Sequence, residues 1–208
     1  MSYPRRAEAL PRNYPVVPAR YPLPMFRLQF EAAGRYLYES ERREALLAAQ
    51  IPPEALSGSA ELTINVSHVA IFVQELTVLC GSDKARTFGR EAFQKNVSLV
   101  PRPALTTPQR AVSESDRLFL RVREAAATLN RLTGSNFMVK WHGGAEADIF
   151  EDTGQHCYGY ICDQLACVAL TGYLSEAVAY LAGVKMQIVE SECMALGALA
   201  CRWHCKPT

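Results

Sequence analysis

Between Cys167 and Pro207 the chain reads CVALTGYLSEAVAYLAGVKMQIVESECMALGALACRWHCKP, and this segment specifies much of the expected architecture. A nearly uncharged run at residues 166–181, with Glu176 as its single charge, predicts a largely buried helix. Residues 184–191 alternate apolar and polar side chains, which predicts a β-strand. Residues 200–205 follow a short turn and predict the partner strand. The segment therefore predicts a helix packed on a β-hairpin.

Three cysteines and a glutamate of this segment form a candidate metal site. Glu190 and Cys193 end the first predicted strand, and Cys201 opens the second, so the hairpin brings the three side chains together. Cys167 opens the preceding helix and can supply a fourth ligand. Such a set suits tetrahedral, structural zinc, which would clamp the helix to the hairpin. Small buried thiols of the core are the alternative interpretation. The spacing leaves open whether other donors take part in metal binding: Cys157, Cys162, His204 and Cys205.

This run resembles the 4-vinyl reductase domain family. The similarity rests on an opening cysteine, a Gly-Tyr helix that ends in glycine, a strand with Glu-x-x-Cys, a glycine turn and a final cysteine. The family includes a bacteriochlorophyll-biosynthesis protein and the sensor domains of phenol-responsive activators, and it is distantly related to trafficking-particle subunits. The resemblance implies structural zinc on Cys167, Glu190, Cys193 and Cys201. It is strong over about the last 50 residues and looser back to Leu62.

The resemblance also implies the fold class. It is an α+β fold in which helices pack on a small antiparallel sheet and enclose an apolar pocket, with the zinc-clamped helix–hairpin at the C-terminus. Trp141 and His142, at the mouth of a predicted hairpin, are the most suggestive ligand-binding pair. The alternative interpretation is that each candidate pocket residue belongs to the ordinary hydrophobic core. The candidate pocket residues are Phe72, Leu76, Phe119, Val139, Trp141, His142, Tyr158 and Tyr173.

The remaining elements follow from periodicity and from glycine and proline. Apolar spacing predicts helices over residues 30–50, 62–79, 83–94 and 113–132, with Ser113 as an N-cap. Gly89 should weaken the third of these helices by ~1 kcal/mol relative to alanine. Two short runs joined by a Gly-Gly pair predict a β-hairpin, at residues 137–142 and 147–151.

We divide the chain into three parts. Six of the 12 prolines lie in residues 1–24, which predicts a leader rich in proline, arginine and tyrosine that is either flexible or docks on a larger complex. Residues 25–57 form an N-terminal helical extension, and residues 58–208 form the ligand-binding domain.

Composition excludes several classes of protein. The 208 residues carry a formal net charge of +1, so no general basic field is present to bind nucleic acid. No apolar run is long enough for a transmembrane segment, and the start lacks the apolar core of a secretory signal. Seven cysteines, an odd number, make a disulfide framework a poor interpretation. We therefore expect a cytoplasmic protein.

The function expected from these observations is binding. No nucleotide, flavin or phosphate motif supports reductase activity, so we lean against an enzyme. The leading hypothesis is a zinc-stabilised binding protein for a chlorophyll-type tetrapyrrole, acting as a carrier or assembly factor in pigment or photosystem biogenesis. The alternatives are a sensor domain for a small aromatic effector and an interaction module that docks through residues 1–24. The resemblance further implies a homodimer.

Overall fold

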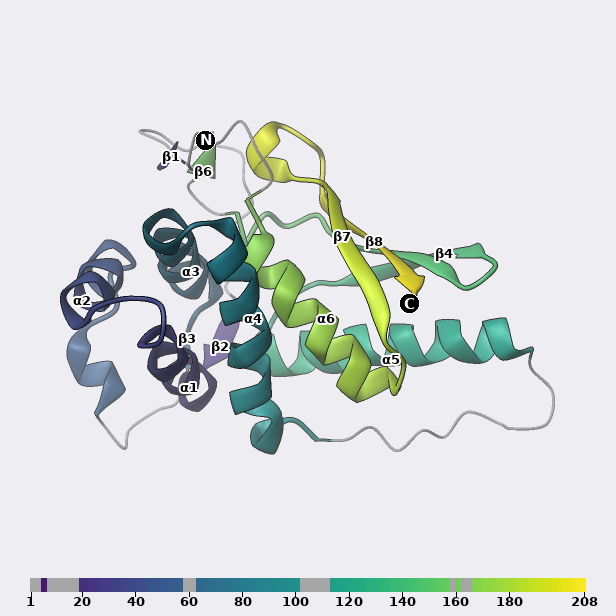
Figure 1. Cartoon of the computed structure of the whole chain (residues 1–208), viewed down its shortest axis with the longest axis horizontal. Coiled ribbons are helices and arrows are strands. Elements are labelled where there is room, and N and C mark those ends of the chain that lie inside the picture. The colour runs from purple at the N-terminus through teal and green to yellow at the C-terminus, as the bar shows by residue number, and fades with distance from the viewer. Residues whose placement is uncertain (1–4, 7–18, 58–62, 102–112, 158–159, 162–165) are drawn as a thin grey trace.

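The computed structural model describes residues 5–6, 19–57, 63–101, 113–157, 160–161 and 166–208 (Figure 1). The helices of this part are α1 Leu23–Ala33, α2 Glu39–Ala48, α3 Val66–Cys80, α4 Ser82–Asn96, α5 Glu114–Thr133 and α6 Val168–Ala182, with 3-10 turns at Pro53–Leu56, Val97–Leu99 and Met194–Leu196. The strands are β1 Arg5–Arg6, β2 Arg20–Pro22, β3 Thr63–Asn65, β4 Met138–Gly143, β5 Glu146–Glu151, β6 Tyr160–Ile161, β7 Met186–Glu192 and β8 Cys201–Pro207.

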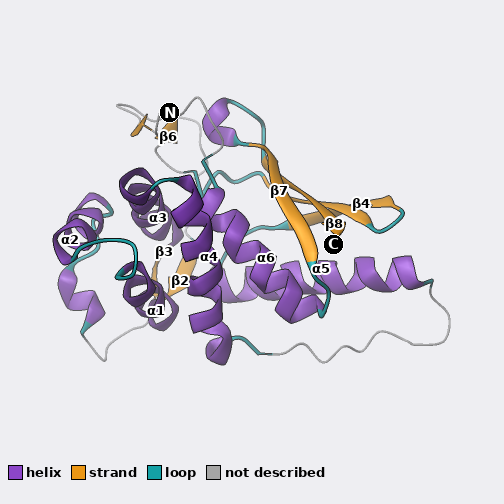
Figure 2. Cartoon of the chain, in the orientation of Figure 1, coloured by secondary structure: helices purple, strands orange, loops and turns teal. Residues whose placement is uncertain are grey.

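The principal sheet has four antiparallel strands in the order β4-β5-β8-β7. Ile149 lies opposite Trp203, and both are buried on the face that α5 and α6 cover (Figure 2). The indole Nε1 of Trp203 donates a 2.9 Å hydrogen bond to Thr171 Oγ1, which joins the sheet to α6. Asp148 and His204 face the other side. The α+β architecture and both C-terminal strands are confirmed.

Helices α4 and α6 approach each other closely because glycine lies at two points of their crossing. A Cβ atom on Gly89 would lie 1.8 Å from the carbonyl oxygen of Ala169, and one on Gly172 would lie 2.0 Å from that of Arg86. Neither space can hold a methyl group. The sequence analysis counted only the low helix propensity of Gly89. The structure shows that this glycine also lets α4 and α6 pack closely.

Helix α5 matches its predicted range, and its start is as expected. The Ser113 hydroxyl accepts a 3.0 Å hydrogen bond from the backbone N–H of Asp116, which is the predicted N-cap. The single helix predicted over residues 30–50 is wrong, since α1 ends at Ala33 and α2 begins at Glu39. Side chains on both sides of the break continue a helical pattern, so periodicity alone did not show it.

The chain enters the folded region before α1. Strand β2 pairs antiparallel with β3, and Tyr21 in its centre is buried. Residues 20–24, assigned above to the leader, thus form β2 and the first residues of α1, which packs against α4. Residues 1–4 and 7–18 of the leader lie outside the described residues. The division into an extension and a ligand-binding domain stays a prediction.

No helix in the described ranges combines the length and apolarity needed to cross a membrane. The structure holds one chain, so the homodimer and docking through residues 1–24 also stay predictions.

Candidate functional site

Four buried cysteine sulfurs meet where the start of α6 faces the turn between β7 and β8. The Sγ atom of Cys157 lies 3.0 Å from that of Cys167, 3.5 Å from that of Cys193 and 3.2 Å from that of Cys201. The Cys167 and Cys201 sulfurs are 3.7 Å apart, and all four lie within 4.8 Å of one another. Three segments, namely the loop at Cys157, the start of α6 and the β7–β8 turn, thus present their thiols to one point.

These spacings resemble those of a tetrahedral metal site. With Zn–S bonds of about 2.3 Å, the sulfurs of a four-thiolate site lie about 3.8 Å apart. Hydrogen bonding from Cys157 and the other thiols lowers the pKa of Cys193, whereas the close packing of the thiols raises the pKa values of Cys157 and Cys167. The thiolate is therefore at Cys193, and a bound cation would be needed to ionise the others. A set of four sulfurs suits zinc or an iron–sulfur cluster.

Glu190 supports the cluster from the side. Its carboxylate accepts the backbone N–H of Cys167, at 3.1 Å to Oε2 and 3.4 Å to Oε1. Of the four predicted ligands, the structure brings the thiols of Cys167, Cys193 and Cys201 together and adds Cys157. Cys162 lies outside the described residues, whereas His204 and Cys205 belong to β8 away from the four sulfurs.

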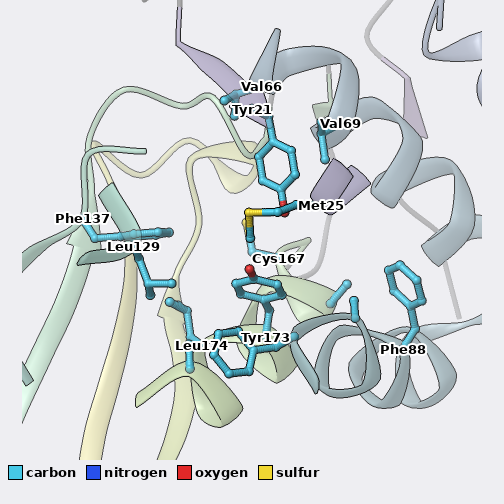
Figure 3. Packing of buried hydrophobic residues seen from close by; sticks show 14 of the residues in the cluster. Tyr21, Met25, Val66, Val69, Phe88, Leu129, Phe137, Cys167, Tyr173 and Leu174 are labelled. Carbon is cyan, nitrogen blue, oxygen red and sulfur yellow. The ribbon is translucent and has the colours of Figure 1, made fainter. Parts of the chain in front are cut away.

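A cavity of about 70 Å³ lies next to this cluster, between α1, α3, α4 and α6. Its walls are mostly apolar, with Val66, Val69 and Ala70 from α3 and Phe88 from α4. Cys167 also lines the cavity, so the thiol cluster and the cavity share one residue. Figure 3 shows Cys167 and Tyr173 among the side chains packed in this region.

Two tyrosines bring hydroxyl groups to one end of the cavity. The hydroxyls of Tyr21 and Tyr173 point toward one another (Figure 3), and the Gln29 amide donates a hydrogen bond to that of Tyr21. Burial raises the pKa of Tyr173 to about 12, so its phenol stays neutral. Tyr21 and Asn96 lie within hydrogen-bonding reach of the Tyr173 hydroxyl and moderate that rise in its pKa.

A second polar group closes another part of the wall. His156 stacks on Phe137, and its Nε2 lies 3.1 Å from the Ser135 hydroxyl. Burial lowers the pKa of His156 to about 4, so the imidazole is neutral near pH 7. Gln74 donates to the His156 carbonyl oxygen at 3.2 Å, while its own Oε1 has no partner among the described residues.

The predicted pocket residues are spread over several environments. Tyr173 lines the cavity, whereas Phe72 and Leu76 are fully buried in the core. Phe119 and Trp141 pack on each other with ring centroids 5.4 Å apart, beside Val139 of the same strand as the indole. His142 hydrogen-bonds to Asp148. Tyr158 lies outside the described residues. Sequence reasoning missed Tyr21, Gln29, Gln74 and His156 as cavity residues, because they come from four separate segments.

Comparison with known proteins locates the fold. No family model matches the chain, and no curated protein matches it. A point mutant of an H-NOX protein from K. algicida, in the unliganded Fe(II) state, has a TM-score of 0.55 at 10% identity, covering 90% of this chain and 96% of its own. An H-NOX protein from Shewanella oneidensis in the Fe(II)NO state has a TM-score of 0.52 at 18% identity, covering 88% and 97%.

These neighbours overturn the expected family. Assignment to the 4-vinyl reductase domain family is wrong, and the chlorophyll-biosynthesis and photosynthesis function inferred from it is wrong with it. The resemblance rested on a short C-terminal pattern of cysteine and glycine, whereas the structural match extends over almost the whole chain. The chain has the fold of the H-NOX domains.

Proposed function

We propose that this chain is a sensor domain that binds a small, uncharged, ring-sized molecule in the cavity beside Tyr173. The observation that carries the proposal is a pair of buried amide oxygens without partners among the described residues, in an otherwise apolar wall: Gln29 Oε1 and Gln74 Oε1. Buried polar groups are normally hydrogen-bonded, so a bound ligand is a physical reason for leaving these open. A ligand-binding role agrees with the fold, since the H-NOX neighbours are haem proteins solved in the unliganded Fe(II) and Fe(II)NO states.

Haem itself does not fit this cavity. Pockets for large ligands measure roughly 300–1,000 Å³, against about 70 Å³ here. The lining residues within the described part include no lysine or arginine to pair with the haem carboxylates. His156 is of a type that can ligate haem iron, but its Nε2 already faces Ser135. The chain therefore shares the fold of its neighbours, but this cavity lacks the volume and the side chains that haem needs.

The size and polarity of the cavity limit the ligand class. An engineered cavity of roughly 150 Å³ accepts benzene, about twice the volume here. A single small ring, admitted by a shift of the cavity wall, is therefore the upper limit. The neutral His156 and Tyr173 side chains and the open amide oxygens favour an uncharged ligand with a hydroxyl group. This is the small-aromatic sensor that the sequence analysis held as an alternative.

Phenol is the appropriate first probe. Calorimetric titration should show saturable binding at one site, and Tyr173→Phe should weaken it about fivefold, because one hydrogen bond is worth about 1 kcal/mol. Val69→Phe, which fills the cavity, should abolish binding. Tyr38→Phe is the matched control, since Tyr38 is 80% exposed and distant from the cavity lining. Saturable haem binding with a shifted Soret band, in a protein that ignores phenol, would contradict the proposal.

We propose further that the thiol cluster is a structural zinc site. Four thiolates at the observed spacing need a cation to lie together in a buried position. Bound zinc would fix the start of α6 against the β7–β8 turn. Four sulfur ligands would fill its coordination sphere and leave no position for water. Cys157 is the fourth ligand on this geometry, and Glu190 orients Cys167 through its backbone N–H.

X-ray absorption separates this ligand set from the one expected from sequence. The zinc-loaded chain should show four sulfurs at about 2.3 Å, and Glu190→Gln should keep all four. Cys157→Ser should lose one sulfur from the first shell. A wild-type shell of three sulfurs and one oxygen, with that oxygen lost in Glu190→Gln, would restore Glu190 as the ligand.

A further inference from the structure

The outer face of the sheet carries two histidines joined by one carboxylate. Nε2 of His142 lies 2.8 Å from Asp148 Oδ2, and Nδ1 of His204 lies 3.0 Å from Asp148 Oδ1. The three residues stand on the neighbouring strands β4, β5 and β8, where Asp148 and His204 are register partners. This group is separate from both the cavity and the cysteine cluster.

The carboxylate is fixed and the imidazoles are accessible. The Asp148 side chain is 7% exposed, whereas those of His142 and His204 are 36% and 39% exposed. Arg202 Nη1 lies 3.7 Å from Asp148 Oδ2 and balances part of its charge, and Arg202 Nε is also 3.5 Å from Glu192. Asp148 is therefore placed to hold both rings while their other edges reach solvent.

Hydrogen bonding to Asp148 determines which ring nitrogens carry protons. An ionised carboxylate only accepts hydrogen bonds, so His142 Nε2 and His204 Nδ1 are the donors. In the neutral rings, His142 Nδ1 and His204 Nε2 then carry lone pairs. A carboxylate behind the imidazole is the arrangement that orients metal-binding histidines.

The free nitrogen of His204 faces a second carboxylate. Its Nε2 lies 3.8 Å from Glu146 Oε2. In the neutral tautomer both atoms are acceptors, so they repel unless a proton or a cation lies between them. This face carries the carboxylates of Asp148, Glu146 and Glu192 against the positive charges of Arg202 and Lys140, the register partner of Asp148. It is therefore the pair of facing acceptors, His204 Nε2 and Glu146, that calls for a cation.

From this juxtaposition we infer that the outer sheet face holds a second metal site, which takes a divalent transition metal such as zinc. His204 Nε2 and Glu146 are its first ligands, His142 supplies the second imidazole, and Asp148 positions both rings. Nitrogen and oxygen donors with room for water suit zinc. Two imidazoles on one tetrahedral zinc place their ring centroids roughly 5 Å apart. The observed separation is 6.5 Å with a tilt of 43°, so the rings need to close by a little over an ångström.

The test uses the full chain after its cysteine cluster has taken up one zinc per chain, as measured by elemental analysis. Calorimetric titration with further Zn²⁺ should show a second, weaker equivalent. His204→Ala and Glu146→Gln should each weaken it at least tenfold, and Asp148→Asn roughly 10–100-fold. His68→Ala is the control, because it removes a histidine that contacts the Ala49 carbonyl oxygen away from the sheet.

Histidine ring nitrogens seen by NMR give a second measurement. Before the second equivalent of zinc is added, His142 and His204 should show opposite tautomers, and that equivalent should shift the signals of both rings. The inference is overturned if the wild-type chain takes up no second equivalent, which would leave a proton between His204 and Glu146. It is also overturned if the second equivalent binds His204→Ala/Glu146→Gln unchanged, or binds without shifting either ring.

Discussion

Replacing Gly89 with alanine tests whether the crossing of α4 and α6 controls the cavity. The added Cβ would lie 1.8 Å from the Ala169 carbonyl oxygen, and ordinary contact begins at 3.4 Å, so the helices must separate by roughly 1.6 Å. The obstacle is backbone, which cannot rotate away. Overpacking costs about 1–3 kcal/mol, and a backbone obstacle at 1.8 Å belongs at the upper end, about 3 kcal/mol. Alanine recovers about 1 kcal/mol of helix propensity. We expect a net loss of about 2 kcal/mol in the free energy of unfolding.

Urea unfolding and thermal melting measure this loss. For a chain of this size, each kcal/mol lowers Tm by roughly 2–4 °C, so Gly89→Ala should melt roughly 4–8 °C lower. It should also weaken phenol binding, because Gly89 lines the cavity. Gly34→Ala is the control: its φ is −63°, and its new Cβ would lie 3.2 Å from both the flexible end of Arg42 and the Glu31 carbonyl oxygen, far less tight than the 1.8 Å at Gly89. A Gly89→Ala chain as stable as wild type would refute the close packing of α4 and α6.

Three further predictions concern the cavity and its supports. Thr171→Val should lower the free energy of unfolding by about 2 kcal/mol in urea, because it leaves the buried Trp203 Nε1 without an acceptor, whereas the exposed Thr87→Val should change it little; equal losses would contradict this role. Burial raises the pKa of Tyr173 from 10.0 to about 12, so its contribution to stability is present below pH 10 and is lost as the pH rises to 12. In alkaline unfolding, Tyr173→Phe should therefore lose less stability than the wild type. An equal loss in both chains would contradict this role of Tyr173. Removing zinc with a chelator should weaken phenol binding in calorimetry, because Cys167 belongs to both sites, and undiminished binding would show that the two are independent.

Local pattern was sufficient for most of the regular structure. Helix α5, both hairpins and the helix before the C-terminal strands follow from periodicity and from caps such as Ser113. The same patterns brought Cys167, Cys193 and Cys201 to one place, because a strand turn and a helix start fix them within a short stretch of chain. The spacing of apolar and polar residues is sufficient to predict an element that is short in sequence and regular.

The rest depended on contacts that sequence spacing does not encode. Cys157 lies in a loop without periodicity, so nothing in its neighbourhood indicated that its thiol meets the other three. Asp148 reaches His204 only because β5 pairs with β8, a register between strands 56 residues apart. The family assignment failed for a related reason. A short pattern of cysteines that joins a helix to a hairpin can stabilise a small sheet in unrelated proteins. Such a pattern therefore indicates a local contact, and it does not identify a family.

The cysteine cluster and the cavity share Cys167 and helix α6, so a change at one can be transmitted to the other. Cys167 supplies a sulfur to the cluster, a wall to the cavity and, through its backbone N–H, a bond to Glu190. Helix α6 starts at the next residue and carries Tyr173 into the same cavity and Thr171 against Trp203 of the sheet. A ligand that reorients Tyr173 therefore acts on a helix whose first turn is anchored at the thiols. Binding free energies are reciprocal, so a cavity ligand that changes the zinc affinity of the cluster by some factor has its own affinity changed by zinc by the same factor.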